Sequence, residues 1–327
     1  TCGSAAGAAS AGWRPITANP KEQTSEMSAL HIRTMTPDDL DFAAACTEAV
    51  GWGAQRGEFE LFHAHDPQGC LVAEREGCSI GICVATPYDG QGFIGMLIVV
   101  PEARGRGVGR LLLERAIDYL DERGARVAGL DAVLAAVPLY ERLGFRRQCR
   151  SLRFGGTIAG RRHSSVRPMA AADLDAVCAL DRAAFGADRR FFLARRLARA
   201  PALCKVLERD GRIDGYLFGR PVEGGVSVGP WAARPELEQP ARLLEALALE
   251  SGEPRIGLGI LESNEAALEA ARSLGLTARR DSPWRMTRVW EDTCVSPDTR
   301  ALSSRPEHTV ALGASPLAYA IGSPAKG

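Results

Sequence analysis

The sequence lacks an excess of charge of either sign, because 40 Lys and Arg residues stand against 40 Asp and Glu residues in a chain of 327. A balanced chain lacks the broad basic field on which non-specific binding to nucleic acid or to an anionic membrane surface depends. It also lacks any uninterrupted apolar run approaching the ~20 residues that a membrane-spanning helix needs. We therefore expect neither nucleic acid nor a membrane among the partners of this protein.

The nine cysteines lack the pattern of a disulfide or zinc framework. No Cys-x-x-Cys pair occurs, the number is odd, and a chain of this length needs no disulfides to hold a core. Reduced cysteines predict a cytoplasmic protein, and the scarcity of acidic residues near the N-terminus leaves organellar import as the alternative. His63-x-His65-Asp66 has residue types that bind metals. No further ligand cluster accompanies it, so we expect no metal.

The length predicts two domains, and with 46% hydrophobic residues most of the chain can bury a core. Residues 1–29 are rich in Ala, Ser, Gly and Thr, which predicts a disordered extension. Met27 stands just before the first structured segment and is a candidate native start. Residues 291–327 are expected to form a mostly irregular tail, in which the apolar stretch Leu317–Ile321 could add an edge strand.

An internal repeat organises the rest of the chain. Ile32-Arg33-Thr34-Met35 recurs as Val166-Arg167-Pro168-Met169, a shift of 134 residues, and further matches keep this register. The repeat predicts two copies of one domain, at residues 30–152 and 164–290. The Gly- and Arg-rich residues 153–163 between them are expected to form a linker.

Each copy is expected to be a mixed α/β domain with a mixed sheet, in which hairpins come first and a strand, turn and helix follow. In the first copy the expected strands are His31–Met35, Cys70–Glu74, Ser79–Ala85, Phe93–Val100 and Val127–Asp131, and the expected helices are Leu40–Val50, Arg110–Arg123 and Pro138–Leu143.

The most specific local signal is the glycine-rich turn between the apolar strand ending at Val100 and the following helix. It reads Arg104-Gly105-Arg106-Gly107-Val108-Gly109-Arg110. Such a turn directs successive backbone N–H groups at one point, and the helix N-terminus adds partial positive charge, so a pyrophosphate fits there. A Walker A loop would need Gly-Lys-Ser/Thr, and a dinucleotide fingerprint would need glycine at Arg110, so neither applies.

Arg104-x-x-Gly107-x-Gly109 after an apolar strand resembles the acetyl-CoA signature of the GCN5-related N-acetyltransferases (GNAT). Pro138-Leu139-Tyr140-Glu141-Arg142-Leu143-Gly144-Phe145 resembles the closing segment of that family, and both motifs stand in the expected order. The resemblance covers the first copy and, more weakly, the second. With Phe185-Gly186, Arg189 and Gly229-Pro230-Trp231, the second half resembles the degenerate C-terminal domain of a tandem subfamily.

The resemblance implies direct transfer of an acetyl group from acetyl-CoA to an amine. Tyr140 would act as general acid toward the leaving thiolate. The family often has Asn seven residues before this Tyr, where Val133 stands here. The strand Met96–Val99 would present backbone N–H groups to the pantetheine and the thioester carbonyl. The residues implied to bind the cosubstrate are Leu97, Ile98, Val99, Arg104, Gly105, Arg106, Gly107, Val108, Gly109 and Arg110.

The general base and the acceptor site are more open. Asp131, which ends the strand before Tyr140, is the first candidate for the base, and Glu58 and Asp89 are alternatives. Gly51-Trp52-Gly53 follows the first helix, where this fold usually places its substrate loop. The acceptor is expected to be an amine of a small molecule or a protein. The sequence identifies neither the acceptor nor the oligomeric state.

The second copy has lost the residues to which the resemblance assigns chemistry. In an ungapped alignment, Glu238, Ala241 and Leu243 replace Arg104, Gly107 and Gly109; with a two-residue gap, Glu236, Gln239 and Ala241 do. Ala271 replaces Tyr140, although Asn264 is kept. We therefore expect an N-acetyltransferase that is active in its first domain and non-catalytic in its second. The alternative is an acyl-CoA-binding sensor or interaction protein without turnover.

Overall fold

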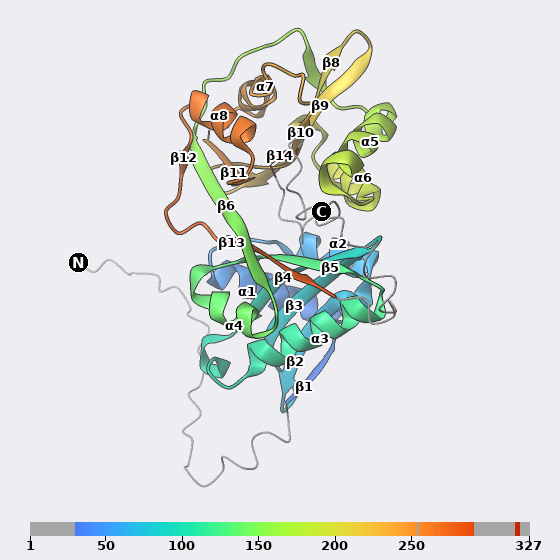
Figure 1. The fold of residues 1–327 in the computed structure, drawn as a ribbon, viewed down its shortest axis with the longest axis vertical. Coiled ribbons are helices and arrows are strands. Elements are labelled where there is room, and N and C mark those ends of the chain that lie inside the picture. The colour runs from blue at the N-terminus through green and yellow to red at the C-terminus, as the bar shows by residue number, and fades with distance from the viewer. Residues whose placement is uncertain (1–29, 254, 291–317, 321–327) are drawn as a thin grey trace, which may run out of the picture.

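The computed structural model describes residues 30–253, 255–290 and 318–320, which form two α/β lobes stacked along the long axis of the molecule (Figure 1). The predictions for residues 1–29, and for most of 291–327, lie outside these residues. The seven cysteines within the described ranges are free thiols. No helix within these ranges combines the length and apolar character that crossing a membrane requires.

The first lobe follows the predicted order of hairpins, strand, turn and helix, with one helix that the sequence analysis did not predict. That helix is α2, which follows α1 and packs its Phe59 and Phe62 into the core. The elements are β1 Leu30–Thr34, α1 Leu40–Ala49, α2 Arg56–His65, β2 Cys70–Arg75, β3 Cys78–Tyr88, β4 Gln91–Val99, α3 Val108–Glu122, β5 Val127–Ala132, α4 Val137–Arg142 and β6 Arg146–Thr157.

Alternation of side chains along the strands gives this sheet two apolar faces. Ala128, Leu130 and Ala132 of β5 lie in one core with α3 and α4. Met96 and Ile98 of β4 lie in the opposite core with α1 and α2. The sheet is thus covered on both sides, and only its ends are open to a ligand.

The second lobe repeats the first with the predicted shift. The bounds of α6, β8, β9 and β10 each lie 134 residues after those of α2, β2, β3 and β4. The elements are β7 Val166–Pro168, α5 Leu174–Phe185, α6 Arg190–Arg199, β8 Cys204–Arg209, β9 Arg212–Val222, β10 Gly225–Ala233, α7 Arg242–Ser251, β11 Arg255–Leu261, α8 Glu265–Ser273, β12 Thr277–Ala278, β13 Trp284–Val289 and β14 Ala318–Ala320.

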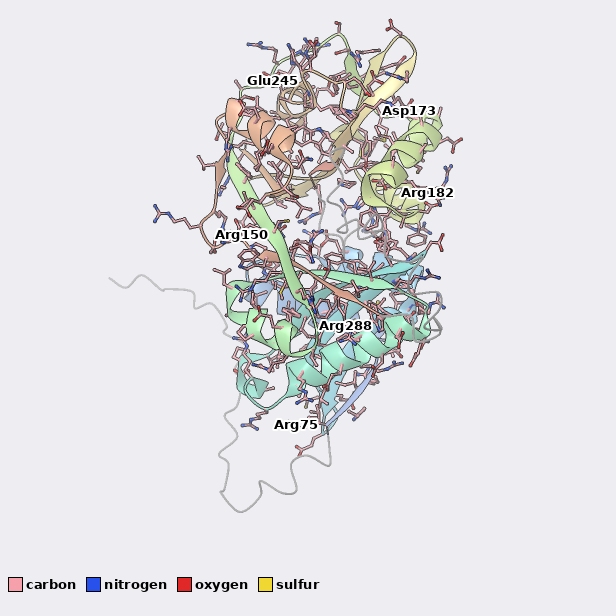
Figure 2. The ribbon with its side chains drawn as sticks, in the orientation of Figure 1. Arg75, Arg150, Asp173, Arg182, Glu245 and Arg288 are labelled. Carbon is pink, nitrogen blue, oxygen red and sulfur yellow. The ribbon has the colours of Figure 1, made fainter. Side chains whose placement is uncertain are left out.

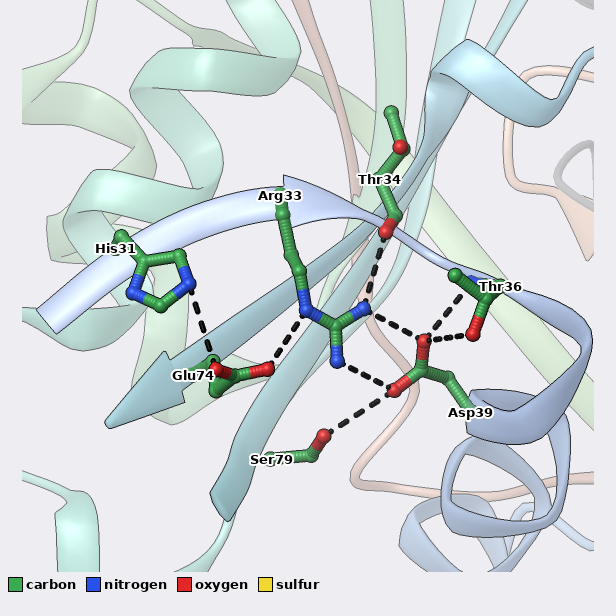
Figure 3. A network of polar contacts seen from close by, with 7 residues as sticks. All are labelled: His31, Arg33, Thr34, Thr36, Asp39, Glu74 and Ser79. Atoms are coloured by element: carbon green, nitrogen blue, oxygen red, sulfur yellow. Dashed lines mark hydrogen bonds and ion pairs between the residues drawn. The ribbon is translucent and has the colours of Figure 1, made fainter. Parts of the chain in front are cut away.

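One polar network occurs in both copies, and Figure 3 shows it in the first. Arg33 donates from Nε to Glu74 at 2.7 Å, and from its two terminal nitrogens to Asp39 at 2.7 and 2.9 Å. The equivalent Arg167 donates in the same way to Glu208 at 2.8 Å and to Asp173 at 2.7 and 2.9 Å. In each copy the network fastens the first strand to the second strand and to the start of the first helix.

The two lobes exchange strands, which the sequence did not predict. The first half of β6 pairs with β13, and its second half, Ser151–Thr157, pairs with β11 of the second lobe. In return β13 inserts between β5 and β6 of the first lobe, so one continuous sheet joins the described parts of both copies. Figure 1 shows β6 rising from the lower lobe and β13 running back into it. Arg150, which lies where β6 leaves the lower lobe, is labelled in Figure 2.

The prediction of a linker is therefore wrong for residues 153–157, which belong to β6. Gly155 and Gly156 suggested a flexible turn, but both lie within the strand. A Cβ on Gly156 would come within 3.0 Å of the Leu276 side chain. The close approach of Leu276 favours a small residue at this position of the strand.

Candidate cosubstrate site in the first lobe

The glycine-rich turn lies at the N-terminus of α3, as the sequence predicts. Gly105 and Gly107 have φ angles of 74° and 81°, a left-handed backbone conformation that favours glycine. A Cβ on either residue would meet nothing within 4 Å, so the turn is open on its outer side. Because the first N–H groups of a helix have no intrahelical acceptor, the turn and the first residues of α3 offer donors to an anion.

The arginines of this turn have different surroundings. Arg104 donates from Nε to the carbonyl oxygen of Val99 at 2.9 Å, which fastens the turn to the end of β4. Arg110 forms an ion pair with Glu114, one helical turn further on, at 2.7 Å. Arg106 is exposed. These three guanidiniums surround the open N-terminus of α3 with positive charge.

Strands β4 and β5 diverge beside this turn. They pair only from Gln91 to Phe93 on β4, although β4 continues to Val99. Met96 has a φ of 54°, and the pairing of β3 with β4 shifts register between Ile82 and Val84. Such a bulge redirects backbone groups away from the regular ladder. The divergent edge includes Leu97, Ile98 and Val99, the strand residues that the sequence predicts to bind the cosubstrate.

Tyr140 of α4 packs in the same core as β5 and α3. Its ring lies edge-on to Phe145 at a centroid separation of 6.0 Å, and the residue is 7% exposed. Burial raises the pKa of its hydroxyl well above the ordinary value. The phenol therefore keeps its proton at neutral pH, which is the form that a general acid needs.

Three large apolar side chains near this site are exposed, and the sequence analysis assigned a role to none of them. Leu111 is 42% exposed on α3, while Val133 and Leu134, just before α4, are 44% and 46% exposed. Exposed aliphatic side chains are suited to contact with an apolar ligand chain. Leu111 was recognisable in the sequence, because it stands between the polar Arg110 and the buried Leu112.

Asp131 lies in a closed ion-pair network that conflicts with a role as general base. Its two carboxylate oxygens accept from Arg285 at 2.8 Å and from Arg153 at 2.9 Å, and Ser151 donates to it at 3.1 Å. Burial acts to raise the pKa of Asp131, but the two guanidiniums outweigh it and lower the pKa to about 2. A carboxylate with so low a pKa is a poor proton acceptor at neutral pH.

The remaining predicted residues lie around the junction of the lobes. Glu58, on α2, forms an ion pair with Arg220 of β9 at 3.1 Å, whereas Asp89 lies in the exposed turn between β3 and β4. Trp52, in the loop between α1 and α2, is 41% exposed. His65 stacks on Phe191 and Phe192 of α6, at 4.9 and 4.7 Å between centroids, so it is part of an aromatic interface.

The corresponding site of the second lobe differs at each functional position. Pro230 stands where Met96 stands in the first lobe, and proline has no N–H group to donate. Helix α7 begins after Ala241, without a left-handed glycine. Ala271, at the position of Tyr140, is fully buried. The retained Asn264 caps α8, because its Oδ1 accepts from the backbone N–H of Ala267 at 2.9 Å.

In the second lobe, strand β14 lies where β10 diverges from β11, which corresponds to the divergence of β4 from β5 in the first lobe. Strand β10 pairs with β11 only from Val226 to Val228. Beyond this point it pairs with β14, through Trp231 and Ala232. The apolar tail stretch noted in the sequence thus forms a strand that follows the diverging part of β10.

Comparison with protein families identifies the class to which this architecture belongs. The protein-family model "Acetyltransferase (GNAT) family" matches residues 40–145, and the family model "Acetyltransferase (GNAT) domain" matches residues 177–293. The two matches together span more than half of the chain. The chain therefore belongs to the GNAT acetyltransferase family and carries two copies of its domain.

Individual relatives support this membership. The chain is 38% identical to N-alpha-acetyltransferase MAK3 of Arabidopsis thaliana, over 25% of this chain and 46% of the relative. It is 28% identical to mycothiol acetyltransferase of Acidimicrobium ferrooxidans, over 40% and 48%. The chain thus spans about half the length of these curated relatives. A solved structure from Pyrococcus horikoshii, described as a candidate acetyltransferase, shares the fold with a TM-score of 0.70 and 22% identity, over 91% of this chain and 96% of the other.

Proposed function

We propose that this protein is an acetyl-CoA-dependent N-acetyltransferase that transfers an acetyl group to an amine in its first lobe. The left-handed turn at Gly105 and Gly107, beside the divergence of β4 from β5, is the observation that carries the proposal. The turn and the N-terminus of α3 are proposed to hold the pyrophosphate. Leu97, Ile98 and Val99 are proposed to line the path of the pantetheine.

When bound, acetyl-CoA supplies the activated acetyl thioester. The bulge at Met96 is proposed to direct a backbone N–H group toward the thioester carbonyl, where it stabilises negative charge. Tyr140, which is protonated at neutral pH, is proposed to donate that proton to the departing sulfur. Asp131 is proposed as a positioning residue, because it joins β5 to Arg153 of β6 and Arg285 of β13.

The second lobe is proposed to be non-catalytic. Pro230 and Ala271 remove the donor and the acid, and the turn before α7 lacks the glycines that a phosphate cradle needs. In addition, β14 pairs with the edge of β10 along which a cosubstrate would otherwise lie. The second half of the chain instead contributes β13 to the sheet of the first lobe, where it pairs with β5 and β6.

Replacing Tyr140 by Phe is expected to lower kcat about 100-fold, because general-acid catalysis contributes on the order of 10² to 10⁴. The affinity for acetyl-CoA should change by less than about threefold, since the ring and its packing remain. Steady-state assays of amine acetylation, together with calorimetric titration of acetyl-CoA, measure the two effects.

Tyr119→Phe is the matched control, because Tyr119 lies in the same core but donates to Asp66 at the far end of α3. It should leave kcat unchanged. Equal turnover in Tyr140→Phe and the wild type would remove Tyr140 from the mechanism. Tight binding of acetyl-CoA without acetylation of any amine would favour the sensor over the enzyme.

Replacing Asp131 by Asn tests whether this carboxylate is a base. We expect the pH profile of kcat/KM to keep its shape, because a group with a pKa of about 2 does not titrate in the working range. The variant should instead be less stable, since two guanidiniums lose their charged partner. Loss of the acid limb of the kcat/KM profile together with most of the activity, with the thermal midpoint unchanged, would restore Asp131 as the base.

A further inference from the structure

Two clefts lie where the lobes meet, and the duplication relates them. The basic cleft is a cavity of about 300 Å³ whose lining includes Glu58, Phe62, Phe192, Arg196, Arg199 and Arg220. The acidic cleft, of about 480 Å³, is lined by residues that include His65, Asp66, Asp89, Glu122, Arg123 and Asp188. The basic cleft is lined by the start of α2, by α6 and by the end of β9. The acidic cleft is lined by the end of α2, by the residues before α6 and by the end of β3.

The same positions of the repeat carry different charges in the two clefts. Arg199 of the basic cleft is equivalent, at the 134-residue shift, to His65 of the acidic cleft, and Ala200 is equivalent to Asp66. Three arginines and one glutamate line the basic cleft, whereas four carboxylates and one arginine line the other. An anion is therefore attracted to one cleft and repelled by its duplicate.

The arginines of the basic cleft are held in place from both lobes. Arg220 contacts Glu58 at 3.1 Å, and Arg199 donates to the carbonyl oxygen of Gly57 at 2.6 Å. Arg196 donates to the carbonyl oxygen of Gly229. Burial lowers the pKa of Arg196 to about 10; Glu58 acts against this shift, and the neighbouring guanidiniums of Arg189 and Arg220 act with it. Positive charge thus exceeds negative charge within the cleft, a surplus that an oxyanion would balance.

The basic cleft also adjoins the proposed acceptor side of the first lobe. Gln55, Gly57 and Glu58 line it and follow the loop between α1 and α2. Phe62 forms part of its wall and belongs to the same packed cluster as Met96, at the bulge of β4. Phe62 thus connects the wall of the cleft with the packed cluster that contains the bulge.

We propose that the basic cleft binds an oxyanion, a carboxylate or a phosphate, carried by the amine that accepts the acetyl group. This inference rests on the proposed acetyl transfer. Guanidinium groups match the planar or tetrahedral oxygens of such anions through charge-assisted hydrogen bonds. The acceptor class is thus an anionic small-molecule amine, in which the charged group fixes the molecule while the amine reaches the thioester.

Inorganic phosphate tests the cleft without any turnover. With coenzyme A in excess to occupy the proposed anion site at the N-terminus of α3, calorimetric titration of the full chain with inorganic phosphate should show saturable binding that weakens about tenfold in Arg196→Gln and in Arg199→Gln, as expected when one charge-assisted contact is lost. Arg199→Gln remains informative if Arg196→Gln fails to fold, because Arg199 is largely exposed. Arg195→Gln is the matched control, since Arg195 lies on the same helix but stacks outward on Phe191. Absence of binding by the wild type, or equal weakening in the control, would overturn the proposal.

Pairs of amines that differ only in an anionic group then distinguish a phosphate from a carboxylate on the acceptor. Ethanolamine phosphate is compared with ethanolamine, and 4-aminobutyrate with butylamine. The anionic member of at least one pair should have a kcat/KM at least about tenfold higher, and Arg199→Gln should remove this preference. Equal acetylation of anionic and neutral amines would refute the acceptor class while leaving the enzyme intact. Phosphate binding without acetylation of any amine would instead refute the transferase.

Discussion

Replacement of Gly107 by Glu is expected to abolish binding of acetyl-CoA, with a loss of affinity of at least about 100-fold, or ~3 kcal/mol. Gly107 has a φ of 81°, so any side chain there strains the turn from which α3 begins. The new carboxylate would also occupy the anion site at the helix N-terminus, where it competes with phosphate for the same donors. Calorimetric titration of the wild type and the variant measures the loss.

Gly124→Glu is the matched control for this experiment. Gly124 lies beyond the other end of α3, has a φ of 76°, and would place a Cβ in open space, as Gly107 would. Both variants therefore carry the same backbone strain and the same added charge, but only one carries them at the proposed phosphate site. Equal loss of binding in the two would attribute the effect to general destabilisation of α3.

The same titration counts the sites. We expect one acetyl-CoA per chain, because β14 and Pro230 occupy the equivalent region of the second lobe. A stoichiometry of two would contradict the proposal that the second lobe is non-catalytic. No binding by well-folded wild type would mean that the turn of the first lobe is itself vestigial.

The features that the sequence predicted well are those specified by residues close together in the chain. The turn from Arg104 to Arg110 carries its own backbone requirement, since glycine is favoured at a positive φ. The repeat was visible because both copies keep the Arg, Asp and Glu of the Arg33 network at the same spacing. Such local signals survive in a sequence without knowledge of the partner strands.

The strand exchange was not predictable in this way. Nothing within residues 146–157 specifies that the second half of β6 pairs with β11 and not with a neighbour in its own copy. That choice depends on contacts with residues more than 100 positions away, such as Gly156 beneath Leu276. Pairing of distant strands is decided by tertiary packing, which local composition does not record.

The surroundings of Asp131 were unpredictable for the same reason. In the sequence it is an acid at the end of a strand, nine residues before Tyr140, which is consistent with catalysis. Its partners Arg153 and Arg285 come from a strand that leaves the lobe and from one that returns to it. Only the exchanged strands bring these three charges together, and they place the candidate base in an ion-pair network.

Replacing Arg285 by Met is expected to destabilise both lobes by about 3 kcal/mol, within the range measured when one partner of a buried ion pair is removed. Arg285 is fully buried in β13, contacts Asp131 at 2.8 Å and lies over the ring of Phe93 at 5.3 Å. The variant leaves Asp131 with Arg153 as its one ion-pair partner, beside the hydrogen bond from Ser151, and the thermal midpoint should fall by about 5 °C. Because β13 belongs to the sheet of the first lobe but follows the second in the chain, unfolding should remain a single transition.

The double variant Asp131→Asn/Arg285→Met is the control that separates charge from packing. It should recover part of the lost stability, since no buried carboxylate is left short of a partner. Acid titration gives an independent reading. The pKa of Asp131 is lowered from 3.8 to about 2, so its stabilising contribution is complete above pH 4 and is lost as the pH falls through 2. The double variant should lack this acid limb, and Arg285→Met, which keeps Arg153 beside Asp131, should show it reduced. Two separate transitions, with only the first lobe shifted, would show that the exchanged strands do not couple the lobes.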